Sequence, residues 1–230
     1  MLGSFSSKFS FGKGKLVVPV SSNPNAVYGT GGATWVSSIN NAPVNDGWTL
    51  LQSSSVDDGY TNFSSLFTFY LYGVGSTSFN VGSNTYITLG SGANQYSSLS
   101  LGPSPIPAIA GLHLGSADNS YQRVWYKTTS TTVQIRYEGN GTTGGTGGLP
   151  GIVYETTFYK SNGTYQYIQI SFGLHNKLSG VFGITSGQVG SGNYLSFATA
   201  GVTPAQYGNY VVRTDPTGNS PTIYAGVYTP

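Results

Sequence analysis

The chain has few of the side chains that acid–base or metal chemistry needs. Its 230 residues include seven acids, nine lysines and arginines, two histidines and no cysteine. Charged residues make up 7 % of the chain, whereas about 25 % is usual for a soluble domain. Without cysteine there is no disulfide, no thiolate metal site and no thiol nucleophile. These absences favour a protein that holds or contacts another molecule, and we expect no enzymatic activity and no cofactor.

The charge balance and the hydropathy also exclude two kinds of partner. A net charge of +2 is too small for a surface that binds nucleic acid by neutralising phosphates. No run approaches the roughly 20 apolar residues that span a bilayer, so we expect no membrane insertion. The first fifteen residues contain lysines but no continuous apolar core of a secretory signal. We therefore expect that the protein does not leave a cell by the standard export route.

Glycine and tyrosine, with 34 and 18 residues, dominate what is present. Most apolar runs are short, rich in β-branched or aromatic residues, and closed by Gly, Asn, Ser or Pro, which predicts strands and turns. The clearest case is 152–172, where two alternating runs flank an Asn-Gly pair, a strong hairpin signal. With the runs at 121–127 and 131–139, this hairpin predicts a four-strand meander.

These patterns predict an all-β fold, an antiparallel β-sandwich of jelly-roll type. The nearly continuous apolar run at 66–72 predicts a strand that is buried on both faces or lies at the centre of a sandwich, and 84–90 predicts another strand. We expect an N-terminal anchoring arm at 1–20, a sandwich domain at 21–200, and a C-terminal arm or edge strands at 201–230.

Asp57 and Asp58, followed by Gly59, form the only acidic cluster. Aspartate and glycine are typical of a turn, and we expect a turn here. The two carboxylates are weak candidates for calcium ligands, because a calcium site needs about six to eight oxygen atoms.

The remaining acids and histidines offer two further chemical interpretations. Glu138 and Glu155 are candidates for a glycosidase pair if strand pairing brings them together. Each also has a cation in reach, Arg136 or Lys127, and cross-strand ion pairs are the commoner outcome. Three residues could ligate a metal, although their spacing matches no known motif: His113, Asp118 and His175.

Aromatic residues on the predicted strands are the better indication of a contact surface. Tyr165 and Tyr167 lie on the face opposite Ile168 and Ile170. Exposed tyrosine among Ser, Asn and Gly is typical of adaptable recognition surfaces, and it also suits the apolar faces of sugar rings. The alternative is that a second sheet or a neighbouring subunit covers this face. The candidate contact residues are Trp125, Tyr154, Tyr159, Tyr165 and Tyr167.

Residues 56–173 resemble the nidogen-type extracellular β domain. The similarity lies in VDDGY, LFTFYLYGVGSTSF and VGSNTYITLGSG, followed by RYEG and VYETTFYKSNGTYQYIQISFG. Similar segments occur in structural proteins of tailed bacteriophages, especially those of cyanobacterial hosts. The N-terminal GSFSSKFSFGKGK resembles the Gly/Phe/Lys-rich arm of many phage virion proteins. Together these segments cover about half the chain, and they imply a nidogen-like sandwich with no catalytic residues.

The resemblance implies a non-enzymatic virion protein that assembles in the host cytoplasm. A tail-fibre or baseplate component that contacts host-surface polysaccharide is the first expectation, and a capsid decoration protein the second. A carbohydrate-binding adhesion module is a further alternative. We expect a homo-oligomer, with a trimer favoured. The arm is expected to dock onto other virion proteins through Phe5, Lys8, Phe9, Phe11, Lys13 and Lys15.

Overall fold

The computed structural model describes thirteen strands and no helix in the part of the chain it covers. The described residues are 47–53, 59–82, 86–91, 108–113, 121–139, 152–161, 165–175, 181–185, 194–196, 209–214, 216–217, 221–225 and 228.

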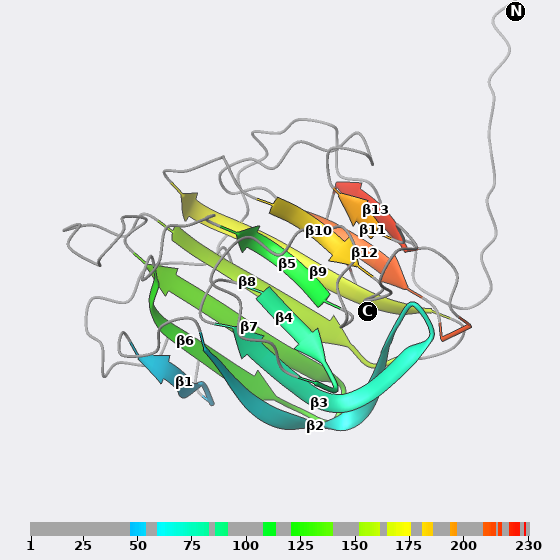
Figure 1. Cartoon of the computed structure of the whole chain (residues 1–230), viewed down its shortest axis with the longest axis horizontal. Helices are drawn as coiled ribbons and strands as arrows, with labels where there is room; N and C mark the ends of the chain where they lie inside the picture. The colour runs from blue at the N-terminus through cyan, green and yellow to red at the C-terminus, as the bar shows by residue number, and fades with distance from the viewer. Residues whose placement is uncertain are drawn as a thin grey trace, which may run out of the picture.

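The strands form two antiparallel sheets, which lie one over the other in Figure 1. The larger sheet has seven strands, in the order β1 (Thr49–Ser53), β6 (Tyr121–Thr128), β7 (Thr132–Gly139), β8 (Ile152–Tyr159), β9 (Gln166–His175), β12 (Asn209–Thr214) and β13 (Thr222–Ala225). The smaller sheet has six, in the order β11 (Tyr194–Ser196), β10 (Val181–Thr185), β5 (Ala108–His113), β4 (Tyr86–Leu89), β3 (Val74–Gly82) and β2 (Tyr60–Leu71). The predicted all-β antiparallel sandwich is confirmed.

Each sheet is built around a meander. Strands β2 to β5 follow one another in the six-stranded sheet, and β6 to β9 in the seven-stranded sheet, so the predicted four-strand meander is confirmed. The chain then returns to place β10 and β11 beside β5, and β12 and β13 beside β9. Among the described strands, neighbours in sequence therefore stay mostly in one sheet, unlike the alternation between sheets of a jelly roll. Strands β12 and β13 also contribute Tyr210, Val212 and Ile223 to the core.

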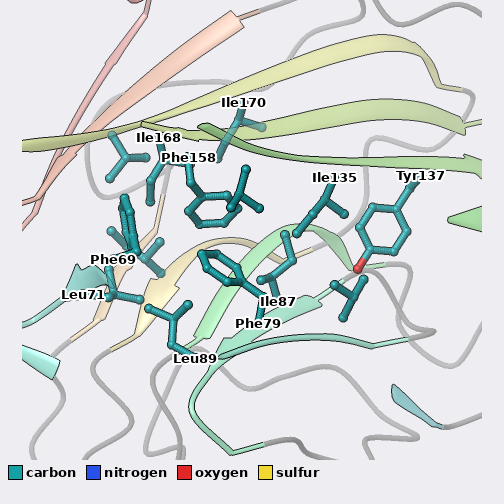
Figure 2. Packing of buried hydrophobic residues seen from close by; sticks show 14 of the residues in the cluster. Phe69, Leu71, Phe79, Ile87, Leu89, Ile135, Tyr137, Phe158, Ile168 and Ile170 are labelled. Carbon is teal, nitrogen blue, oxygen red and sulfur yellow. The ribbon is translucent and has the colours of Figure 1, made fainter. Parts of the chain in front are cut away.

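Aromatic rings from both sheets meet in the core. The ring of Phe158 on β8 lies edge-on to Phe69 on β2, with centroids 5.1 Å apart, and to Phe79 on β3, at 4.9 Å. Figure 2 shows these rings among the aliphatic side chains of both layers. Burying aromatic rings at such angles stabilises the core through apolar area and through ring geometry. Because buried and outward residues alternate along the strands, one face of each sheet lines this core.

Tyr137 links the two sheets through its hydroxyl group. Its side chain on β7 is fully buried, and the hydroxyl donates to the backbone carbonyls of Gly82, at 3.2 Å, and Tyr86, at 3.0 Å. Gly82 has to be glycine, because a Cβ atom there would collide with the ring of Tyr86. The polar end of a buried tyrosine is therefore satisfied across the sandwich (Figure 2).

Uncharged side chains also join the margins of the two sheets. The Gln166 amide accepts a hydrogen bond from the Tyr70 backbone N–H at 2.6 Å and donates one to the Thr68 carbonyl at 3.1 Å. The Thr214 hydroxyl donates to the Tyr70 carbonyl at 3.0 Å. At the opposite margin the Gln52 amide donates to the Val81 carbonyl at 2.6 Å. These bonds fix how one sheet sits over the other.

Of the two alternatives predicted for 66–72, the structure shows a strand with one face in the core of the sandwich, through Phe67, Phe69 and Leu71, and not one buried on both faces. Strand β2 is the edge of its sheet, and its register with β3 shifts between Ser64 and Phe69. Outward and inward residues alternate along β2 without interruption through this shift, so Leu66 is 72 % exposed while Phe67 is buried. The Ser65 hydroxyl stabilises the bulge by donating to backbone carbonyls, including that of Thr77 at 3.2 Å.

The β2–β3 hairpin turns through Tyr72 and Gly73, both with positive φ, 50° and 79°. Positive φ at both central residues is typical of a type I′ turn, which matches the twist of the two strands. Glycine accepts this backbone freely, whereas tyrosine is strained there. Tyr72 packs against the core, and this contact offsets the strain.

Replacing Tyr137 with phenylalanine tests the link between the sheets. Tyr137→Phe keeps the ring but leaves the carbonyls of Gly82 and Tyr86 without this donor, so the free energy of unfolding should fall by roughly 1–3 kcal/mol. Tyr126→Phe is the matched control, because Tyr126 also lies between the sheets, where it stacks on Phe63 through its ring. Urea denaturation of the three proteins measures the difference, and equal stability of both variants would contradict the assigned role.

Candidate interaction surfaces

The outer face of the seven-stranded sheet carries a cluster of three tyrosines. Tyr167 on β9 stacks on Tyr228, with centroids 4.2 Å apart and planes 19° apart. Tyr159 on β8 lies 4.6 Å from Tyr228, at a tilt of 60°. Tyr228 itself is buried. Tyr159 and Tyr167 were predicted to contact a partner, and within the described chain their rings already contact a residue near the C-terminal end of the sequence.

A buried glutamine fixes the backbone of Tyr228. The Gln169 side-chain oxygen accepts a hydrogen bond from the Tyr228 N–H at 2.7 Å. Its amide nitrogen donates to the Asn209 side-chain oxygen at 3.2 Å and to the Tyr210 carbonyl at 3.3 Å. The tyrosine cluster is therefore held by backbone hydrogen bonding as well as by ring contact.

The other predicted contact residues lie in different surroundings. Tyr165 is half-buried, with the Arg213 guanidinium 4.6 Å from its ring centre, a cation–π contact. Trp125 on β6 is only 3 % exposed, so it presents no free surface in the single chain. Tyr154 lies in β8, with Tyr137 and Phe172 as its strand partners.

The predicted virion-docking residues and the weak calcium candidates lie outside the described residues. The docking residues are Phe5, Lys8, Phe9, Phe11, Lys13 and Lys15, and the calcium candidates are Asp57 and Asp58. Both predictions stay predictions.

Glu155 forms an ion pair with Arg136. Its Oε2 accepts a hydrogen bond from Arg136 Nη1 at 2.9 Å, across the β7–β8 ladder, and both side chains are largely buried. This is the cross-strand pair expected from the sequence. Glu138 lies two residues from Arg136 on β7, but its side chain is outside the described residues, so the glycosidase pair stays a prediction.

The predicted metal-ligand candidates lie on two strands and in a segment outside the described residues. His113 lies in β5 of one sheet and His175 in β9 of the other, while Asp118 is outside the described residues. Among the residues that the structure describes, no group of three or more His, Asp or Glu could hold a metal ion.

Several tyrosine hydroxyls are shifted toward the neutral form. Burial raises the pKa of Tyr72 to about 12. Burial also raises the pKa of Tyr159, and the negative charge of Glu155 adds to the effect. The pKa of Tyr228 rises because of burial and then because of Tyr167 and Tyr159 beside it. Two members of the tyrosine cluster, Tyr159 and Tyr228, are therefore held in the neutral form at physiological pH.

Charge is divided unequally between the two sheets. The six-stranded sheet contains no Asp, Glu, Lys or Arg in any of its strands. In the seven-stranded sheet the charged residues are Arg123, Lys127, Arg136, Glu138, Glu155 and Arg213. One layer of the sandwich is thus neutral and the other charged.

Strand β2 exposes a neutral row of side chains, which we call the β2 strip: Tyr60, Asn62, Ser64, Leu66 and Thr68. Leu66 is 72 % and Tyr60 40 % exposed. Beside the strip, on β3, Val74 is also exposed. The strip combines one phenol, one amide, two hydroxyls and a large apolar side chain, and it carries no charge.

The neutral sheet and the tyrosine cluster differ in how far the sequence reveals them. The run 59–117 lacks Asp, Glu, Lys and Arg throughout, and this signal could have identified the neutral sheet. The contact of Tyr228 with Tyr159 and Tyr167 has no such signal, because it joins residues that are far apart in the chain.

Comparison with protein-family models, with curated proteins and with solved structures finds no match to this chain. Within the described residues, no helix is long and apolar enough to cross a membrane. The function therefore has to be inferred from the residues and from the surfaces they form.

Replacing Tyr228 tests whether the tyrosine cluster stabilises the fold. Tyr228→Ala removes a buried ring from Tyr159 and Tyr167, so the free energy of unfolding should fall by roughly 2–4 kcal/mol. Tyr228→Phe keeps the ring and the backbone N–H, and should stay within about 1 kcal/mol of the parent protein. Chemical denaturation measures both. An alanine variant as stable as the parent would show that the cluster contributes nothing.

The raised tyrosine pKa values predict a loss of stability at alkaline pH. Tyr72 ionises near 10.0 when unfolded and near 12 when folded, so its contribution is complete below pH 10 and is lost as the pH rises toward 12. The free energy of unfolding should fall across this window, and less steeply for Tyr72→Phe, because phenylalanine does not ionise. Urea denaturation at stepped pH measures both slopes, and parallel slopes would contradict the assignment.

Proposed function

We propose that the protein is a non-enzymatic virion component of a tailed bacteriophage, associated with the tail fibre or baseplate. In this proposal its N-terminal arm docks onto another virion protein and its sandwich contacts the host surface. The observation that carries the proposal is the neutral six-stranded sheet, whose edge exposes the β2 strip. Neutral polysaccharide offers hydroxyl groups and apolar ring faces, and the strip offers side chains that suit both.

Two further observations favour the neutral sheet as the contact surface. The carboxylate of Glu155 on the larger sheet is bound by the Arg136 guanidinium. Tyr159 and Tyr167, two of the predicted contact tyrosines on the larger sheet, pack with Tyr228, and this contact reduces the aromatic surface that the larger sheet offers to a partner.

The basic aromatic arm supports assembly into a particle. Three of the nine cations lie in the first fifteen residues, among Phe5, Phe9 and Phe11, with no acid nearby. Phenylalanine would fill apolar grooves on another virion protein, and lysine would meet carboxylates or carbonyls around them. The resemblance of this segment to virion arms is the reason for choosing a phage particle. We also propose that the protein is a homo-oligomer in the particle.

A capsid decoration protein is the second candidate, because chain segments at both ends of a domain can join neighbouring subunits. In that case the neutral sheet would lie on the capsid surface and not face the host. Binding of the purified protein to host-surface glycans favours the tail location, whereas binding only to assembled capsids favours decoration.

Substitutions in the arm of the full-length chain test the docking proposal. Changing Phe5, Phe9 and Phe11 to serine, or Lys8, Lys13 and Lys15 to glutamate, should abolish incorporation into particles and leave the melting temperature unchanged. Lys160→Glu is the control for charge, because Lys160 is exposed on the sandwich and should not affect incorporation. Mass spectrometry of purified particles gives the incorporated amount. Normal incorporation of both arm variants would refute docking through the arm.

A further inference from the structure

The two halves of strand β2 differ in the hydrogen bonds that they make on the side that faces away from β3. In the second half, the Gln166 amide and the Thr214 hydroxyl bond to the backbone of Thr68 and Tyr70. Gln166 is 1 % exposed, so this part of the edge is closed. In the first half, Tyr60–Ser64, no side chain from the described residues bonds to the strand backbone. The bulge at 65–68 separates the two halves.

The first half also lacks the features by which proteins usually protect an edge strand. In natural proteins, lysine, proline, a bulge or a covering segment prevents an edge strand from pairing with another chain. Residues 60–64 contain neither charge nor proline and pair regularly with β3 from Tyr60↔Gly82 to Ser64↔Ser78. Tyr60, Asn62 and Ser64 are exposed. In the described structure this segment is a regular, neutral strand with one open side.

We infer that residues 60–64 pair with the same residues of a second copy of this chain, antiparallel, across a two-fold axis. An edge strand recognises an extended backbone, because its N–H and C=O groups lie in one row. A strand that meets itself places each residue opposite its own symmetry mate or a near neighbour. Charged residues would repel in such a pairing, and here the neutral strand is complementary to itself.

The pairing has one register of full overlap. The segment Tyr60–Ser64 overlaps completely with its copy only when the two-fold axis passes between Asn62 and Asn62 of the second copy. Asn62 then faces Asn62 of the second copy, and Tyr60 faces Ser64. Two facing amides can bond to each other, and the tyrosine ring can cover the smaller serine. The two six-stranded sheets become one continuous sheet, and both neutral faces lie on the same side of it.

The second copy would pair with one edge of the six-stranded sheet, whose outer face is the contact surface in the proposed function. The pairing rests on the proposed function only in this respect. The pairing is two-fold and accounts for a dimer, so the trimer expected from the sequence would need a different contact. A protein that pairs through β2 but is absent from particles would contradict the proposed function alone. A protein that enters particles without this pairing would contradict the inference alone.

The absence of cysteine makes a single introduced thiol a specific probe. Asn62→Cys in the full-length chain should form a disulfide-linked dimer under mild oxidation, because directly paired residues lie within the Cα separation that a disulfide spans. Thr77→Cys is the control, since Thr77 is exposed on the neighbouring strand β3 but away from the edge. Gel electrophoresis without reductant should show the dimer for Asn62→Cys only. Equal yields from both variants, or no dimer from Asn62→Cys, would overturn the inference.

Charge variants provide a second measurement that does not depend on oxidation. Asn62→Lys places like charges opposite each other and should raise the dissociation constant of the self-association by roughly a hundredfold. Asn62→Asp should act in the same way, and an equal mixture of the two variants should restore association. Thr77→Lys should leave it unchanged. Sedimentation of the full-length proteins measures all four. A monomeric parent protein, or association that is insensitive to charge at residue 62, would overturn the inference.

Discussion

The side-chain amide of Gln166 takes the place of a neighbouring strand for part of β2, bonding both to an N–H and to a C=O of that edge. Gln52, Thr214 and Tyr137 make comparable bonds elsewhere between the sheets. All four side chains are uncharged, and all four bond to backbone atoms. Hydrophobic contact alone has no direction, so these bonds determine how the sheets sit over one another. The core and both outer faces depend on that placement.

The sequence predicts the strands better than it predicts their neighbours. The alternation in 131–139 and the Asn-Gly pair act over a few residues, and the corresponding strands β7, β8 and β9 are present. The position of β2 at a sheet edge depends instead on contacts 96 and 144 residues away, through Gln166 and Thr214. No local pattern records such distances, and therefore the sequence left open whether the run at 66–72 is buried on both faces or lies in the core of a sandwich.

The candidate surfaces show the same division between local and distant information. Alternation correctly placed Tyr167 opposite the buried Ile168 and Ile170. It could not reveal that Tyr228 covers Tyr167, or that Trp125 is buried although it alternates with the core residue Val124. The uncharged run at 59–117 is visible in the sequence. That β10 and β11 extend the same neutral sheet follows only from the pairing of β10 with β5.

The separation of charge between the two layers has a consequence for how the molecule orients itself. In the strands of the seven-stranded sheet four cations stand against two acids, and the other sheet has none of either. When only the strands are considered, all charged side chains, and therefore the source of the electrostatic field, lie in one layer of the sandwich. Near an acidic surface at low ionic strength, the strands would turn the seven-stranded sheet inward and leave the neutral layer facing solution. Salt weakens such a preference, so the layer that the strands turn toward solution depends on ionic strength.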